Sequence, residues 1–425
     1  MENKNLALTQ GMTNDKIGQI TVRKVKRLKK IRGSMVWFFA VMFMFNMAAN
    51  FVHPVTPTII VDLELGDAMF GLALAAMMLC NFLFSPFWGK MAGLLSSRKV
   101  MLISGFGYAA GQVLFGLART EIEFLLARMF AGIFVGGCYV SFLTYTANCS
   151  PEEKRGKNLA INATISSVSA SFGYFVGGLI GEVNVYASVW LQAAALALTA
   201  LILFFLCRDD KQTDARSMQG KAWLRACNPF SVILQCRHFL TRALVFLFLA
   251  YGLGNLGYIA FEQCFNYFLK KQFQLTSGYN GIIKAILGLI SLAANGTLCM
   301  WILRQKRVSA YLAGVMAVCT AAMIGVIFFE QPLPFILVNV LFFAFYFVSV
   351  PLMQNRAAVL GNGPQSNLVM GAFNAVKSFG SIFGSALAGV IYTWHPKLPF
   401  VFGFIAFALA ALMAFMMSRE EAKAA

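Results

Sequence analysis

Long apolar segments alternate with short polar ones along almost the whole chain of 425 residues. A helix that crosses the hydrocarbon core of a bilayer needs about 20 predominantly apolar residues, and twelve segments meet this requirement. We expect membrane-spanning helices near residues 35–60, 69–89, 99–118, 123–146, 159–181, 185–206, 243–269, 278–303, 308–329, 333–355, 368–392 and 398–417. The pattern therefore predicts an all-α membrane protein with twelve transmembrane helices.

The longest polar interruption lies in the middle of the chain, with six predicted spans on each side of it. This arrangement predicts two six-helix bundles that are joined by a loop and flanked by two tails. The expected parts are a basic N-terminal tail (1–33), an N-terminal bundle (34–206), a central loop (207–242), a C-terminal bundle (243–417) and a C-terminal tail (418–425).

The two halves also share short sequence matches, which indicate an internal repeat. One triplet recurs 210 residues later and another recurs 211 residues later. The matched triplets are Leu65, Gly71 and Ala75 with Leu275, Gly281 and Ala285, and Phe172, Gly173 and Gly178 with Phe383, Gly384 and Gly389. Parallel repeats of six helices predict two pseudo-symmetric bundles about an axis along the membrane normal, with a solute cavity between them near the midplane.

The composition agrees with a membrane protein and excludes other classes. Hydrophobic residues make up 59% of the chain and charged residues only 12%, whereas a soluble domain has about 25% charged residues. The 42 Phe exclude intrinsic disorder, and the nine Cys contain no CxxC pair that would suggest a disulfide scaffold. Too little polar surface remains to face water on all sides.

The distribution of cations predicts the orientation in the membrane. An even number of spans places both termini on one side, and 28 of the 35 Lys and Arg fall on that side. By the positive-inside rule, both termini are cytoplasmic and the protein lies in the plasma (inner) membrane. The formal net charge of +18 therefore reflects topology and needs no nucleic-acid partner. The basic stretch at residues 23–30 also suits anionic lipid headgroups.

The segment after the second predicted span, residues 89–99, resembles the G-x-x-x-D-R-x-G-R-[KR] loop of the major facilitator superfamily. Gly93 stands at the acidic position of that motif, and Ser96-Ser97 replace its Gly-Arg pair. The residues expected to form a gating loop are Gly89, Lys90, Arg98 and Lys99.

Two further segments carry the same resemblance. Arg128 and Gly132 are similar to the R-x-x-x-G signature of the superfamily. Residues 173–178 are similar to the G-P-x-x-G-G segment of drug–proton antiporters, with Tyr174 in place of the proline. The resemblance covers essentially the whole chain and implies a twelve-helix transporter of a drug-efflux-like subgroup whose loop and antiporter motifs are degenerate.

Charged residues inside the predicted spans are candidates for function, because each costs roughly 2.5–3.5 kcal/mol to insert. Four such residues are present, together with one histidine: Arg128, Glu262, Lys284, Lys377 and His53. Three cations against one acid also suit an anionic substrate. Arg128 has a second interpretation, in which backbone carbonyls and helix packing satisfy it.

Polar residues extend these positions into helical faces. Asn46, Asn50 and His53 share one face of the first span, and Asn374 and Lys377 share one face of the eleventh. Asn46 and Lys377 both lie roughly 14 Å from the cytoplasmic end of their spans, so we expect them to share a cavity. These residues and Arg128 are the candidate substrate-binding groups in this region.

The seventh and eighth spans supply the other candidates. Asn255, Tyr258 and Glu262 lie on one face of the seventh, and Lys284 lies at a similar depth in the eighth. Two interpretations remain open: a structural Glu262–Lys284 ion pair, or a proton-carrying Glu262, since burial disfavours its charged form. Asn255, Tyr258 and Lys284 are candidate substrate-binding residues.

The sequence contains no nucleotide-binding loop, metal-ligand cluster or hydrolase triad, so we expect a non-enzyme with no cofactor and no metal, driven by an ion or solute gradient. The preferred function is proton-coupled efflux of small amphipathic organic compounds or drugs by a monomer working through alternating access. One alternative is uptake or exchange of a small organic anion at the buried Lys and Arg. A second is a transporter-like membrane receptor or sensor.

Overall fold

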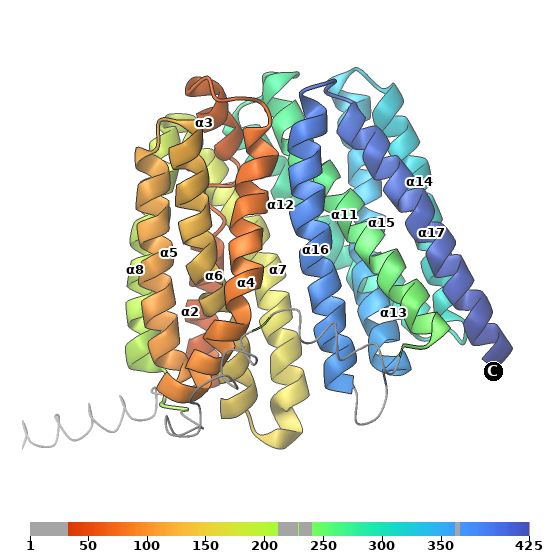
Figure 1. The fold of residues 1–425 in the computed structure, drawn as a ribbon, viewed down its shortest axis with the longest axis horizontal. Coiled ribbons are helices and arrows are strands. Elements are labelled where there is room, and N and C mark those ends of the chain that lie inside the picture. The colour runs from red at the N-terminus through yellow and green to blue at the C-terminus, as the bar shows by residue number, and fades with distance from the viewer. Residues whose placement is uncertain (1–32, 211–227, 229–239, 362–365, 425) are drawn as a thin grey trace, which may run out of the picture.

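The computed structural model describes residues 33–210, 228, 240–361 and 366–424, and the two halves of this part of the chain stand side by side (Figure 1). The first half contains α2 (Met35–Ala48), α3 (Thr56–Asp62), α4 (Met69–Leu95), α5 (Ser97–Leu117), α6 (Glu121–Cys149), α7 (Glu152–Val183) and α8 (Val185–Leu206). The second contains α11 (Arg242–Lys271), α12 (Ser277–Ala294), η2 (Asn295–Cys299), α13 (Met300–Leu303), α14 (Val308–Phe328), α15 (Pro332–Leu360), α16 (Ser366–Tyr392) and α17 (Leu398–Ala424).

Twelve membrane segments are present in the described residues. Eleven are helices long and apolar enough to cross a membrane, and the shorter helix α2 begins the twelfth. We call the end of the molecule that carries α3 the α3 side, and the opposite end, where α2 begins and α17 ends, the tail side (Figure 1). The predicted all-α membrane fold is confirmed. Most of the basic N-terminal tail (1–32) and of the central loop (211–227 and 229–239) lies outside the described residues.

The halves pack together through α4 against α16 and α7 against α12. At the first contact, a Cβ atom added to Gly71 would lie 2.8 Å from Gly389 Cα. At the second, a Cβ added to Gly281 would lie 3.2 Å from Gly178 Cα. Only glycine permits such close approach of two backbones. These four residues are members of the matched triplets, so the internal repeat places equivalent glycines at both contacts.

The first span is interrupted, so the predicted continuous helix 35–60 is wrong. Helix α2 ends at Ala48 and α3 begins at Thr56. Pro54 lies between them, and a proline in a helix interior removes a hydrogen bond and clashes with the preceding turn. The carbonyl oxygen of Ala49 accepts hydrogen bonds from Gln192 Nε2 (2.9 Å) and Tyr108 Oη (3.3 Å). Irregular backbone at this depth is tolerated because neighbouring helices bury and satisfy it.

The predicted gating loop at residues 89–99 is also different from the observed structure. Helix α4 continues to Leu95, and α5 begins at Ser97, so only Ser96 connects them, with a φ of 91°. Gly89 and Lys90 therefore lie on α4, and Arg98 and Lys99 lie in the first turn of α5. Four of the five residues between Lys90 and Ser96 are good helix formers (Met91, Ala92, Leu94 and Leu95), which favours extension of the helix despite Gly93.

Side chains of the segment that follows α8 fix this turn. The carboxylate of Asp210 accepts hydrogen bonds from the backbone N–H of Ser97 (2.7 Å) and from its hydroxyl (2.6 Å), and Arg98 pairs with Asp209 at 2.8 Å. A carboxylate at a helix N-terminus satisfies free N–H groups there. At the other end of the chain, α17 continues as a helix through the predicted tail 418–425 as far as Ala424, and Glu421 pairs with Arg356 at 2.7 Å.

Asp67, in the connection between α3 and α4, joins the halves on the α3 side. Its Oδ1 atom accepts hydrogen bonds from Tyr267 Oη (2.7 Å) and Lys271 Nζ (2.8 Å), both on α11. Partial burial raises the pKa of the Asp67 carboxyl, but the hydrogen bonds from Lys271 and Tyr267 outweigh it, so the pKa lies below its usual value. The charged form is therefore the one that the folded protein favours.

We expect Asp67→Asn to lower the free energy of unfolding at pH 7 by about 1 kcal/mol, the range for a partly exposed pair. Because the folded pKa is depressed, this contribution is present above about pH 4 and is lost as the pH falls through the folded value. Thermal unfolding of the purified protein at pH 7 and at acid pH measures the difference. Asp62→Asn is the matched control, since Asp62 is exposed and pairs with no described residue. A gap between wild type and Asp67→Asn that stays constant down to pH 3 contradicts the prediction.

Candidate functional site

The interior charges of α11 and α12 form an ion pair. Lys284 Nζ on α12 lies 2.7 Å from Glu262 Oε1 on α11, and the two side chains are 8% and 16% exposed. A Glu262–Lys284 ion pair was one of the two interpretations of these residues, and the contact between them is confirmed. The same ammonium lies 5.0 Å from the ring centroid of Phe343 and 5.4 Å from that of Tyr174. The aromatic faces add attraction for the cation and keep water away from the pair.

Tyrosines surround the carboxylate. Tyr258 stacks on Tyr346 with 3.9 Å between ring centroids, and both lie within electrostatic range of Glu262, as does Tyr174. Tyr174 belongs to α7 in the first half, whereas Glu262 and Lys284 belong to the second. The ion pair is therefore placed at the junction of the halves, and a change in its charge acts on the contact between them.

Arg128 on α6 occupies a neighbouring buried position in the first half. Its Nη2 atom donates a hydrogen bond to Thr56 Oγ1 (3.1 Å), and its guanidinium carbon lies 3.8 Å from the ring centroid of Phe115. The residue is 5% exposed. A hydroxyl and an aromatic face satisfy only part of a guanidinium, which carries five N–H donors. Arg128 therefore keeps donors that can bind a further group.

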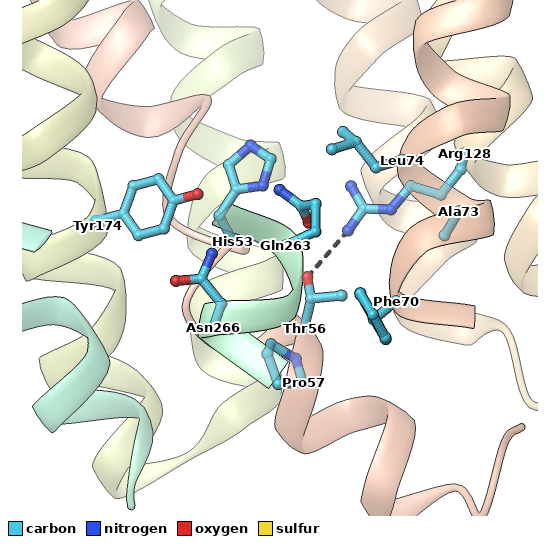
Figure 2. Close-up of a pocket in the computed structure, with 10 residues that line it drawn as sticks. All are labelled: His53, Thr56, Pro57, Phe70, Ala73, Leu74, Arg128, Tyr174, Gln263 and Asn266. Atoms are coloured by element: carbon cyan, nitrogen blue, oxygen red, sulfur yellow. Dashed lines mark hydrogen bonds between the residues drawn. The ribbon is translucent and has the colours of Figure 1, made fainter. Parts of the chain in front are cut away.

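A small cavity lies beside Arg128, and Figure 2 shows the side chains that point into it. His53, in the irregular segment after α2, stacks on Tyr174 with 5.4 Å between ring centroids and an interplanar angle of 10°. Gln263 and Asn266 reach the same cavity from α11 (Figure 2). Neither amide was among the predicted binding residues, although polar residues at i and i+3 in an apolar span are a signal of an interior face.

The polar face of α16 forms a separate group. Asn374 and Lys377 are exposed. The opposite side of the helix carries exposed apolar residues that suit contact with lipid, namely Phe383 (54%), Leu387 (38%) and Val390 (41%). The exposed face with Lys377 is therefore turned toward the space between the halves.

Three of the predicted binding amides donate hydrogen bonds to backbone carbonyl groups of helices. Asn255 Nδ2 donates to the carbonyl oxygen of Lys377 (2.8 Å) and to Ser381 Oγ (2.9 Å), which ties α11 to α16. Asn46 Nδ2 donates to Met42 O (2.9 Å), and Asn50 Nδ2 donates to Asn46 O (2.8 Å).

The prediction that Asn46, Asn50 and His53 share one helical face is wrong. Helix α2 ends at Ala48, so Asn50 and His53 lie beyond the helix. Asn46 is 1% exposed, whereas Lys377 is exposed. Neither residue lines the cavity beside Arg128, and their shared cavity stays a prediction.

Twelve membrane segments in two related halves, with charged groups held between them, define a membrane transporter fold. Residues 38–362 match the family model of the Major Facilitator Superfamily, which is most of the chain. The chain therefore belongs to this superfamily. The resemblance found in the short motifs is confirmed.

Curated relatives include bacterial drug-resistance proteins. Multidrug resistance protein 2 of Bacillus subtilis is 22% identical over 368 residues, which cover 84% of this chain and 89% of the relative. Multidrug resistance protein 1 of the same organism is 23% identical and covers 87% and 92%. Quinolone resistance protein NorA of Staphylococcus aureus is 21% identical and covers 89% and 95%.

Solved structures show the same fold at lower identity. A bacterial homologue of the human lysosomal transporter Spinster, in an inward-facing and unoccupied conformation, matches with a TM-score of 0.71 at 14% identity and covers 91% of this chain and 96% of that one. The human organic anion transporter MFSD10 matches with a TM-score of 0.65 at 16% identity and covers 90% and 99%.

We expect the Glu262–Lys284 pair to behave as one unit in stability measurements. Lys284→Met or Glu262→Gln alone leaves a buried polar or charged group without its partner, and Lys284→Met should cost roughly 3–5 kcal/mol. The double variant should recover most of that loss, since both partners are then neutral. Thermal unfolding of the four proteins in detergent measures the coupling. Lys423→Met is the control, because its pair with Glu420 is exposed on the lysine side, at 71%. Additive single effects in the double variant would show that the pair is not a unit.

Proposed function

We propose that this protein is a secondary active transporter that exports small amphipathic organic compounds in exchange for protons, by alternating access of two six-helix halves. The resistance proteins among its relatives support efflux of such compounds. An ion gradient supplies the free energy, so the proposal needs no bound cofactor or metal. Membership of a transporter superfamily supports transport rather than catalysis.

The observation that carries the proposal is the Glu262–Lys284 pair at the junction of the halves. Glu262 is the one acidic residue in the interior of the described spans. When a proton binds to its carboxylate, the attraction to Lys284 falls, and the ammonium is released toward Tyr174 on α7. Because α7 and α12 form one of the two contacts between the halves, proton binding there acts directly on that contact.

The arrangement of contacts supports a state that is closed on the α3 side. The hydrogen bonds that join described residues of the two halves all lie there: Asp67 with Tyr267 and Lys271, Thr58 with Ser277 (3.0 Å), and Ser385 with the Gly71 carbonyl (2.8 Å). The exposed face with Asn374 and Lys377 lies nearer the tail side.

We assign the tail side to the cytoplasm, because the sequence places most cations there. The state is then inward-facing, and both termini are cytoplasmic in the plasma (inner) membrane. In this state a compound from the cytoplasm reaches Asn374 and Lys377 first, and Tyr258 and the ion pair lie deeper. The protein acts as a monomer in this scheme, since each chain contains both halves of the pathway.

Proton coupling can be tested in inside-out vesicles with an acidified lumen and a fluorescent amphipathic cation such as ethidium. The wild-type protein should accumulate the dye only with the imposed pH gradient. Glu262→Gln should lose the dependence on the gradient and reduce the rate at least about tenfold, as expected for a lost proton-transfer group. Glu330→Gln is the matched control, since Glu330 is exposed in the connection between α14 and α15. An unchanged pH dependence in Glu262→Gln places the proton site elsewhere.

The exposed Lys377 favours a second candidate function, uptake or exchange of a small organic anion. No acidic residue of the described chain pairs with it, and a carboxylate substrate would supply the missing charge. Lys377→Met should then abolish flux of an organic anion such as benzoate in proteoliposomes while dye transport persists. Circular dichroism and size-exclusion profiles show whether the variant is folded. Anion flux at the wild-type rate in folded Lys377→Met would sink the anion-site idea.

A further inference from the structure

Two buried amides lie without partners in the contact that closes the α3 side. Asn266 on α11 is 5% exposed, and Asn280 on α12 is 3% exposed. The Oδ1 atom of each is buried, and no hydrogen bond joins either side-chain amide to any other residue that the structure describes. Buried polar groups are almost always satisfied, so two exceptions at one place require an explanation.

Both amides line one small space where the two halves meet. Pro54 and Thr58 of the first half form one wall of it, and α11 and the start of α12 form the other. The hydroxyls of Thr58 and Ser277 are joined beside the amides by a hydrogen bond of 3.0 Å. The space has no room for a water molecule. Ordered water therefore does not supply the missing hydrogen bonds while the halves are in contact.

The surroundings of the amides are mostly apolar. Leu269 lines the same space and is 1% exposed, and Val55 and Ile59 of the first half belong to the same buried cluster as Leu269. Apolar groups favour the closed arrangement, since separation of the halves exposes them to water. An unpartnered amide acts in the opposite direction, because it loses its hydration when the halves close and recovers it when they separate.

The other polar groups of this contact have partners and stabilise the closed arrangement. Thr58 pairs with Ser277, and Asp67 accepts hydrogen bonds from Tyr267 and Lys271. The α3 side therefore combines polar pairs that hold the halves together with two amides that weaken the same contact.

We propose that Asn266 and Asn280 are gate residues, whose missing hydrogen bonds keep the closed α3 side close in free energy to an open one. Each amide raises the ratio of open to closed molecules by about tenfold relative to an apolar side chain of similar shape, as expected for a buried polar group without a partner. When the α3 side opens, water reaches both amides. The inference rests on the alternating access of the proposed function, but not on the exported compound or on the proton site.

The test is hydrogen–deuterium exchange of the full chain in lipid nanodiscs, without any transported compound. Peptides from α3 (Thr56–Asp62) report on the α3 side, and peptides from the junction of α4 and α5 (residues 89–99) report on the tail side. In Asn280→Leu, exchange should slow by up to about tenfold on the α3 side and become faster on the tail side. A purely structural gain in stability slows exchange on both sides.

Three further variants separate the amide from other effects. Asn280→Ala removes the amide without adding volume, so it should show the same reciprocal change even if leucine is too large. Thr58→Val also places an apolar side chain in the contact, but it removes an existing hydrogen bond and leaves Ser277 without a partner, so exchange on the α3 side should become faster. Tyr279→Leu is the matched control, since Tyr279 is 57% exposed beside Asn280 and should change neither side.

Several outcomes would overturn the proposal. Exchange that slows on both sides, or on neither, in Asn280→Leu and Asn280→Ala would show that the amide does not set the balance between the two arrangements. Equal slowing on the α3 side in Thr58→Val and Asn280→Leu would assign the effect to apolar burial alone. The proton site is tested separately: a reciprocal change in Asn280→Leu together with an unchanged pH dependence in Glu262→Gln would support the gate and reject Glu262 as the proton carrier.

Discussion

The interior of a bilayer offers no hydrogen bonds, so each polar group placed at that depth must find its partner within the protein. The packing of this chain follows that constraint. The break between α2 and α3 is held because Gln192 and Tyr108 bind the freed carbonyl of Ala49. The charge of Lys284 is tolerated in the interior because Glu262 pairs with it and aromatic rings surround it. Arg128 is held by a hydrogen bond to Thr56 and by the ring of Phe115.

The same constraint explains why charge and mechanism coincide. An acid and a base that are bound to each other in a dry interior are stable only as a pair, so adding a proton to one changes the environment of the other. Here both members of the pair belong to the second half, and one of the aromatic rings that Lys284 contacts is that of Tyr174 in the first half. A change in the charge of Glu262 would therefore act on the contact between the two halves, as the proposed proton coupling requires.

Much of the fold could be predicted from the sequence because hydrocarbon thickness dictates the length of each apolar segment. The six-plus-six division and the repeat followed from the pattern and from recurring glycines such as Gly71 and Gly281. Pro54 was a signal of the break after Ala48, but the apolar segment around it is long enough for one continuous span, so a continuous helix was predicted. The one-residue turn at Ser96 could not, since it depends on Asp210, more than a hundred residues away.

The candidate site was predicted unevenly for a similar reason. Helical spacing places residues on one face, so the Glu262–Lys284 contact could be anticipated from depth in adjacent spans. Spacing does not show which helix lies opposite. The meeting of Arg128 with Gln263 and Asn266 across the halves, and the use of Asn255 to hold α16, are tertiary facts that only the packed structure reveals.

The glycine contacts between the halves have a mechanical consequence. Two bodies that touch closely at two separated points keep one easy relative motion, a rotation about the line through those points. Gly71 against Gly389 and Gly178 against Gly281 define such a line near the α3 side. In the proposed alternating access, rotation about this line would widen or narrow the tail side while the glycine contacts on the α3 side hold. In the same scheme, opening of the α3 side would require the glycine contacts themselves to part, which would make it a different step from movement of the tail side.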